Sequence, residues 1–291
     1  MKLLKLIKYK LIEPDLDRQA NVRFIHQKPR HYNLGDDLCS PKHYFEFRAS
    51  SSGVVNVLGG GVQSGFYLDK VKFLRLDPGR TVLWGVGQSV KGDCRPGEVS
   101  KLPYRFWGLR DGDSVGEENF LPCVSCLHPM LDVPEINDVS VLLFVNYDPQ
   151  ITTGAARDRI SELFPGVRIL YNNCTWQEFG GALREASHIV TNSFHGAYWG
   201  LLSGRHVSLI GYSSKFFSLI GTLGLDPGRI IKVERGSECD LVEGICLAMR
   251  GLHYQRLEDA RDCRNRFRMI NLGFANRLAG SELFSSVVRR D

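Results

Sequence analysis

The chain has 291 residues, of which 43% are hydrophobic and 24% are charged, and these proportions are typical of a soluble globular protein. Its length is too great for one ordinary core and suits two domains of middling size. The net charge of +5 is spread along the chain without a dense basic block, which argues against nucleic-acid binding and suits acidic small molecules.

The N-terminal segment, MKLLKLIKYKLIEPD, alternates lysines with leucine and isoleucine. Its charges interrupt any signal-peptide core, and no apolar run in the chain is long enough to span a bilayer. We therefore predict a cytoplasmic protein. An ordinary strand or helix with solvated lysines is the favoured interpretation of this segment, and contact with an anionic membrane surface is the alternative.

The first strand is expected at residues 22–26, and the polar loop after it has the residue types of a ligand site. This loop leads through Asn33 and Gly35 into a helix that begins near Asp36 or Asp37. Acidic residues favour a helix start, which is the plainer interpretation of one of these two aspartates. Asn33 has two interpretations as well, a hydrogen bond to a ligand or the shaping of the turn.

A buried strand at residues 54–58 ends in three consecutive glycines, residues 59–61. Gly60 and Gly61 would let backbone amides approach a ligand closely, whereas a plain tight turn needs only one glycine. The spacing matches neither a dinucleotide-binding fingerprint nor a P-loop. Further strands of the first half are expected at residues 81–87, at 105–111, where Arg110 lies at the end, and at 121–127.

The pattern restarts after a polar, proline-containing stretch at residues 131–138, which we interpret as a linker between domains 1–134 and 135–291. Polar and glycine residues gather at strand ends in both halves, and in open α/β sheets that edge binds ligands. The sequence predicts an α/β fold of two Rossmann-like βαβ domains that face a cleft. In the second half, strands are expected at residues 139–146, 167–171, 188–190, 206–211 and 229–233, and helices at 155–164, 176–186, 194–202, 216–223, 240–251 and 254–278.

The stretch ASHIVTNSFHGAYWGLLS, residues 186–203, is the strongest candidate for the chemistry. A short apolar strand ends there, and a helix begins at once with Ser193 as its N-cap and His195 in its first turn. A helix N-terminus has unpaired N–H groups and suits an anion, and a histidine can move a proton near neutral pH. A histidine that only caps or packs is the alternative.

Cys123 and Cys126 have CxxC spacing, but no second pair of ligands follows at the spacing of a zinc site. No carboxylate or histidine cluster has ligand spacing either. We therefore predict no metal.

Four short motifs follow one another along the chain: NLGDD at residues 33–37, LGGG at 58–61, LRD at 109–111 with Ser114 just after it, and TNSFHG at 191–196. Together they resemble the polysaccharide pyruvyl transferase family, and TNSFHG between a buried strand and an apolar helix carries most of the resemblance. The resemblance implies a GT-B-like fold and transfer of a pyruvyl group from phosphoenolpyruvate to a sugar. The first domain would lie on the acceptor side and the second on the donor side, with the last helix packing back on the first domain.

This chemistry needs a proton-transfer group, a base and cations for a trianionic donor. We assign proton transfer to His195, and Asp36 is a second catalytic candidate, as a base. Arg110 and Lys215 are candidates for holding the donor, together with the amides after Ser193. The remaining substrate-binding candidates are Asn33, Asp37, Gly60 and Gly61.

Some members of the family have an arginine two residues before the motif histidine, and this chain has Ser193 there. A cation that holds the donor's carboxylate or phosphate would then come from elsewhere in the chain. The candidates for that cation are Arg110, Lys215, Arg205 and Arg229.

The predicted reaction uses phosphoenolpyruvate as a substrate and needs no cofactor. Its acceptor would be a glycan or a lipid-linked oligosaccharide, and the latter would bring the protein to the inner face of the cell membrane. Two other interpretations stay open. The same layout suits a GT-B glycosyltransferase with a nucleotide-sugar donor, and the missing arginine suits a non-catalytic glycan-binding homologue.

Overall fold

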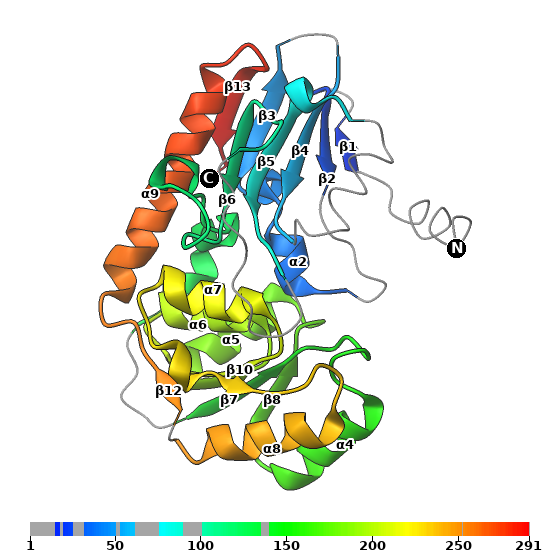
Figure 1. The fold of residues 1–291 in the computed structure, drawn as a ribbon, viewed down its shortest axis with the longest axis vertical. Coiled ribbons are helices and arrows are strands. Elements are labelled where there is room, and N and C mark those ends of the chain that lie inside the picture. The colour runs from blue at the N-terminus through cyan, green and yellow to red at the C-terminus, as the bar shows by residue number, and fades with distance from the viewer. Residues whose placement is uncertain are drawn as a thin grey trace, which may run out of the picture.

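The computed structural model describes residues 15–17, 20–25, 32–50, 53–61, 76–89, 101–134, 140–251 and 253–290. Within these ranges the chain is an α/β protein with two sheets of mostly parallel strands (Figure 1). The basic N-terminal segment before residue 15 and residues 135–138 of the predicted linker lie outside the described residues. The predicted boundary at residue 134 therefore stays a prediction.

The first sheet has the strand order β1-β2-β4-β5-β6, and only β1 runs antiparallel to its neighbour. The central strands β4 and β5 are buried along their whole length, because a parallel sheet is covered on both faces. The strands are β1 (Asp15–Asp17), β2 (Val22–Ile25), β4 (Val55–Gly59), β5 (Thr81–Val86) and β6 (Phe106–Leu109).

The strand predicted at residues 121–127 is wrong. The chain there forms the 3₁₀ turn η5 (Val124–Leu127), and Cys126 donates its backbone hydrogen bond locally to Cys123. Pro122 has no N–H group to give to a sheet ladder, so the segment leaves the sheet after the single bridge between Leu109 and Phe120.

The second sheet has the order β11-β10-β9-β7-β8, with β12 added antiparallel to β10. The chain order reverses between β7 and β9, and ligands of such doubly wound sheets bind beyond the carboxyl ends of the strands at that point. The strands are β7 (Val141–Val145), β8 (Arg168–Tyr171), β9 (His188–Thr191), β10 (His206–Gly211), β11 (Ile231–Lys232) and β12 (Tyr254–Gln255).

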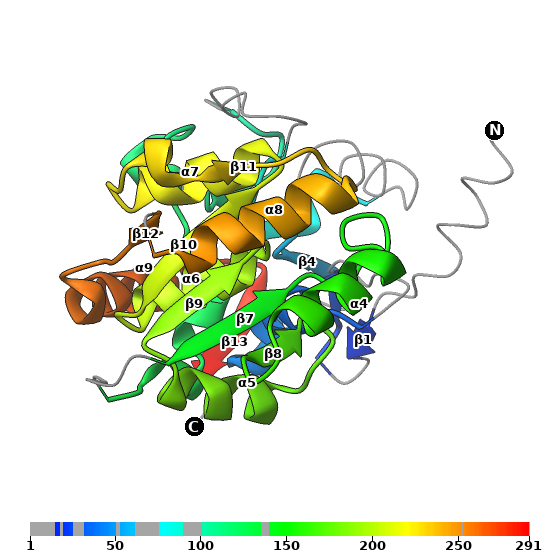
Figure 2. The ribbon, with the colours of Figure 1, turned by 90° about the horizontal axis from the view of Figure 1, so that it is seen from below.

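Helices cover both faces of the second sheet (Figures 1 and 2). Helices α4 (Gly154–Leu163) and α8 (Glu238–Met249) pack on one face, in a core with Leu143 and Val190. Helices α5 (Trp176–Glu185) and α6 (Phe194–Leu202) pack on the other, with Phe144 and Ile189. Alternate strand residues thus face opposite cores.

The end of the chain differs from the expected single helix at residues 254–278. Its first residues form β12, and the helix is α9 (Ala260–Ala279). Residues beyond it form β13 (Phe284–Arg289), which pairs antiparallel with β3 (Phe45–Ala49). Neither β3 nor β13 was predicted, because each of them pairs with a strand that is distant in the sequence.

Helix α9 runs along both halves of the molecule and reaches the first sheet (Figure 1). Trp84 of β5 donates its indole N–H to Asn271 Oδ1 at 2.7 Å, and its ring meets Phe274 edge to face. The amide of Asn271 donates to the carbonyl of Pro122 at 3.2 Å. Asn271 is fully buried and joins α9, β5 and the segment before η5.

We expect Asn271→Leu to lower the free energy of unfolding by roughly 1–3 kcal/mol, because it leaves the buried Trp84 indole without an acceptor. Chemical denaturation measures the change. Asn276→Leu, at an exposed position of the same helix, is the control and should stay within about 0.5 kcal/mol of the native protein. Equal losses in the two variants would contradict the role given to Asn271.

Candidate functional site

The candidate site lies where the carboxyl ends of the second sheet meet the short helix α2 (Leu34–Leu38) of the first half (Figure 1). The backbone N–H of Leu34 donates to the carbonyl of Asn172, just after β8, at 2.7 Å. Across the switch point, the side-chain oxygen of Asn192 accepts from the backbone N–H of Asn146 at 2.7 Å. These bonds fix α2 and the start of α6 against the same edge of the sheet.

The predicted start of α6 is confirmed. Ser193 is the N-cap, and its hydroxyl accepts from the backbone N–H of Gly196 at 3.5 Å. His195 follows in the first turn and is buried. A Cβ atom added to Gly35 would lie 2.1 Å from His195 Nδ1, so glycine is required where α2 meets the imidazole. His195 Nε2 lies 3.7 Å from Cys123 Sγ.

His195 is neutral at ordinary pH. Burial is the main cause, and the positive charges of Arg110 and Lys215 add to it, so that the pKa of His195 lies well below its usual range. The thiol beside it is also neutral, because burial raises the pKa of Cys123. The neutral imidazole has a lone pair that can accept a proton, and an anion that offset the charges of Arg110 and Lys215 would raise its pKa.

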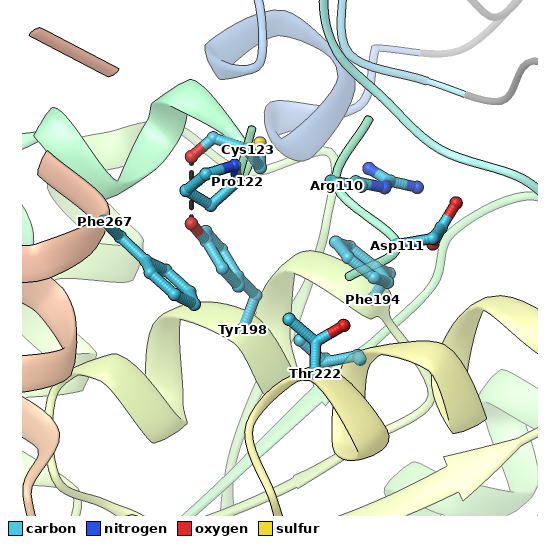
Figure 3. Close-up of a pocket in the computed structure, with 9 residues that line it drawn as sticks. Arg110, Asp111, Pro122, Cys123, Phe194, Tyr198, Thr222 and Phe267 are labelled. Atoms are coloured by element: carbon cyan, nitrogen blue, oxygen red, sulfur yellow. Dashed lines mark hydrogen bonds between the residues drawn. The ribbon is translucent and has the colours of Figure 1, made fainter. Parts of the chain in front are cut away.

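Arg110 follows β6 directly and is only 7% exposed. Its guanidinium carbon lies 3.9 Å from the centre of the Phe194 ring, the first residue of α6 (Figure 3). A Cβ on Gly87 would come within 2.3 Å of Arg110 Nε, so this glycine leaves the room that the arginine occupies. Arg110 is thus held between the end of one sheet and the helix that starts from the other.

Two nitrogens of Arg110, Nε and Nη1, are buried and have no hydrogen-bond partner within the described part of the chain. The neighbouring carboxylate of Asp111 is used elsewhere, since it accepts from the hydroxyl of Ser218 at 2.9 Å and from the backbone of Gln88. Buried cations are ordinarily paired, because an unpaired buried charge is costly. The unpaired nitrogens of Arg110 are therefore suited to bind an anionic ligand.

The charges of Asp36 and Lys215 act on each other within the site. Burial raises the pKa of Asp36, although the charges of Lys215 and Arg110 oppose that shift. Burial and then Arg110 lower the pKa of Lys215, although Asp36 opposes that shift. Lys215 lies in the first turn of α7 (Ser214–Thr222) and its ammonium is 3.4 Å from the hydroxyl of Tyr212. Both groups are thereby moved toward their uncharged forms.

Three sequence candidates have structural duties within the chain. Asn33 is the N-cap of α2 and accepts from the backbone N–H of Gly35 at 3.0 Å. The Cβ position of Gly60 is filled by Cys39, and its N–H donates to the carbonyl of Trp84 at 3.2 Å. The carbonyl of Gly61 accepts from the backbone N–H of Gly87 at 3.0 Å. Ligand-binding amides at the two glycines were the expectation, and the amide of Gly60 has a partner inside the protein.

Two of the alternative cations lie away from the site. Arg205 is buried and donates to the carbonyls of Leu183 and Pro134. Arg229 donates to the carbonyl of Tyr254 at 2.9 Å. Of the four arginine and lysine candidates, Arg110 and Lys215 are the two whose charges act on His195.

Three residues of the site were missed by sequence reasoning. The ring of Phe194 packs against the Arg110 guanidinium. Cys123 lies beside His195. The charge of Arg235 acts on Lys215 and on the hydroxyl of Tyr212. The CxxC spacing of Cys123 does not indicate its contact with His195. Arg235 follows β11, so its place at a strand's carboxyl end is the pattern that would have found it.

Within the described ranges, no group of three or more histidine, cysteine or acidic side chains is arranged to hold a metal ion. The same part of the chain contains no helix with the length and apolar character that crossing a membrane requires. No protein-family model matches the chain, and no protein of curated function matches it in sequence. The site's own geometry therefore carries the functional argument.

Because His195 is buried and neutral, we expect the free energy of unfolding to depend on pH. Its pKa is near 6.5 when unfolded and lower when folded, so the unfolded state binds the extra proton as pH falls below about 6.5. The native protein should therefore lose stability there, with a contribution from His195 of up to about 1.4 kcal/mol per pH unit.

Denaturation of the native protein and of His195→Gln between about pH 7 and 5 isolates this contribution. The slope of unfolding free energy against pH should be shallower in the variant by about one bound proton. Identical slopes would show that His195 is not held neutral by the fold.

Proposed function

We propose that the protein transfers a pyruvyl group from phosphoenolpyruvate to a sugar and forms a pyruvate ketal. The observation that carries this proposal is the buried guanidinium of Arg110, whose Nε and Nη1 have no partner in the described chain. A guanidinium presents its N–H groups as a planar fork that fits a carboxylate or a phosphate. Phosphoenolpyruvate has both groups, attached to the same carbon of a small planar skeleton.

The cations around Arg110 suit a donor with several negative charges. Lys215 and Arg235 lie at the ends of neighbouring strands, and their charges reach the same site. The first turn of α6 adds the positive end of a helix of nine residues. In this proposal Arg110 holds the carboxylate, while Lys215 and the amides after Ser193 hold the phosphate.

The reaction moves two protons and needs no oxidant or reductant. One sugar hydroxyl adds to C2 of the donor while C3 gains a proton and becomes a methyl group. A second hydroxyl of the same sugar then displaces the phosphate from C2 and closes the ketal. The two hydroxyl protons balance the one gained at C3 and the one that leaves on hydrogen phosphate.

The shifted pKa values suggest which group takes which proton. Asp36 was expected as a base, but burial raises its pKa, so it is now our candidate for the acid that protonates C3. His195 begins neutral and is our candidate for the base that accepts the hydroxyl proton. The donor's negative charge would raise the pKa of His195 by offsetting Arg110 and Lys215, so the imidazole accepts the proton more readily when the donor is bound.

The proposal extends to the arrangement of the two halves and to the place of action. We propose a GT-B-like layout, with the donor held by the second sheet and the acceptor approached from the first half. An acceptor linked to lipid would be met at the cytoplasmic face of the membrane.

Calorimetry with phosphoenolpyruvate tests the donor site directly. The native protein should bind it, and Arg110→Gln should bind it roughly 10- to 100-fold more weakly, since hydrogen bonds to charged groups contribute about 1.5–3 kcal/mol. Gly87→Ala should weaken binding too, because its methyl group occupies the place of Arg110 Nε. Gly273→Ala, a helix position with open space around it, is the matched control and should bind as the native protein does.

Turnover is then measured with phosphoenolpyruvate and a panel of methyl hexopyranosides, by phosphate release and by the added pyruvyl mass. Asp36→Asn and His195→Gln should each reduce turnover by about 100-fold or more. Turnover of nucleotide sugars without phosphoenolpyruvate would favour the glycosyltransferase instead. Glycan binding with no donor consumed would favour the non-catalytic homologue.

A further inference from the structure

A line of aromatic and polar side chains runs beside α2, on the first-half side of the candidate site. The hydroxyl of Tyr32 donates to Asp37 Oδ2 at 3.4 Å, and Asp37 Oδ1 lies 3.3 Å from His43 Nε2. The ring of His128 lies 5.2 Å from the ring of Trp176, and the ring of Tyr44 lies 6.2 Å from that of His43 and 6.3 Å from that of His128. We call these residues, Tyr32, Asp37, His43, His128 and Trp176, the aromatic patch.

The two ends of the aromatic patch are exposed rings. Tyr32 is 50% exposed and Trp176 is 43% exposed, so both rings offer apolar contact area. Trp176 is the first residue of α5 and follows a capping box, in which Thr175 and Glu178 bond each other's backbone and fix the backbone of this turn. Its ring is also fixed by contact with His128. A rigid exposed ring offers stacking area that costs little further ordering when a ligand binds.

The groups between the rings are hydrogen-bonding groups. Asp37 is a carboxylate acceptor, and His43 is partly exposed beside it. His128 accepts from the backbone N–H of Met130 through Nδ1, and burial lowers its pKa to about 4. The neutral ring therefore carries its hydrogen on Nε2, which makes that nitrogen a donor.

A pyranose ring matches this combination. One face of the sugar is lined by C–H groups that stack on an aromatic ring, and its edge carries hydroxyls that both donate and accept. A protein partner would require a contiguous apolar area, whereas here polar groups separate the two rings. A nucleotide's phosphates would be repelled by Asp37, which leaves an uncharged polyhydroxylated ligand as the better fit.

The aromatic patch adjoins the proposed reaction site through α2. Successive residues of this helix face the two regions, since the charges of Lys215 and Arg110 act on Asp36, while Asp37 bonds Tyr32 and His43. The bond from Leu34 to Asn172 ties α2 to the loop that leads into Trp176. We propose that the aromatic patch is the acceptor subsite and binds a pyranose by stacking on Trp176. Only the assignment of the bound sugar as the acceptor rests on the proposed pyruvyl transfer.

Intrinsic fluorescence reports on this site, because Trp176 is the most exposed of the four tryptophans and Trp84 and Trp199 are fully buried. The native protein is titrated with methyl β-D-galactopyranoside, methyl β-D-mannopyranoside and lactose, and with sorbitol as an open-chain polyol. We expect a fluorescence change with at least one cyclic sugar at millimolar concentration and none with sorbitol. Saturation-transfer NMR measures the same binding in variants that lack the tryptophan.

Trp176→Ala should weaken sugar binding by about tenfold or more, and Trp176→Phe, which keeps a ring, should retain most of it. Tyr254→Ala is the matched control, because Tyr254 is 41% exposed but lies by His188 and His206 at the opposite ends of the strands. It should leave sugar binding unchanged. Absence of sugar binding in the native protein, or equal binding by Trp176→Ala, would overturn the subsite.

Calorimetry with phosphoenolpyruvate on the same variants separates this inference from the proposed function. Trp176→Ala should bind phosphoenolpyruvate as the native protein does, because the aromatic patch does not contain Arg110 or Lys215. Sugar binding that depends on Trp176 in a protein that binds no phosphoenolpyruvate would support the subsite and refute the pyruvyl transfer. Pyruvyl transfer that is undiminished in Trp176→Ala would support the proposed function and refute the acceptor subsite.

Discussion

All nine residues of helix α6 are buried, and the candidate site depends on that burial. The helix packs on the second sheet through Gly196 and Gly200, where a Cβ would come within 3 Å of Phe144 and Ile189. Its other side meets the first half, since Tyr198 donates to the carbonyl of Cys123 at 2.9 Å and Trp199 to the hydroxyl of Ser125 at 3.0 Å. The first turn of α6 is therefore held from both sides, and His195 with it.

The same packing explains why charged groups gather in a region of low polarity. Arg110 stacks on Phe194 at the start of α6, and its charge, with that of Lys215, lowers the pKa of the buried His195. Within the described residues Arg110 Nε and Nη1 have no partner, and a buried donor without a partner is costly, so we propose that a bound anion would stabilise this site. Local conflicts of this kind are typical of functional sites in otherwise well-packed proteins.

The sequence was most informative where local patterns decide the structure. The apolar run before Ser193 and the cap itself are enough to place β9 and α6. The positions of Arg110 and Lys215 at strand carboxyl ends also follow from the pattern, because parallel strands bring those ends to one edge. Local patterns do not reveal pairs that are distant in sequence. The pairing of β3 with β13, the contact of His195 with Cys123, and the filling of Gly60 by Cys39 all depend on the tertiary fold.

The central claim is that Arg110 is the cation that receives the donor's anion. A crystal structure of the protein with phosphoenolpyruvate tests it most directly. We expect oxygen atoms of the donor within hydrogen-bond distance of Arg110 Nε and Nη1, above the Phe194 ring and near His195. Phosphoenolpyruvate bound elsewhere, with these two nitrogens still unpartnered, would contradict it.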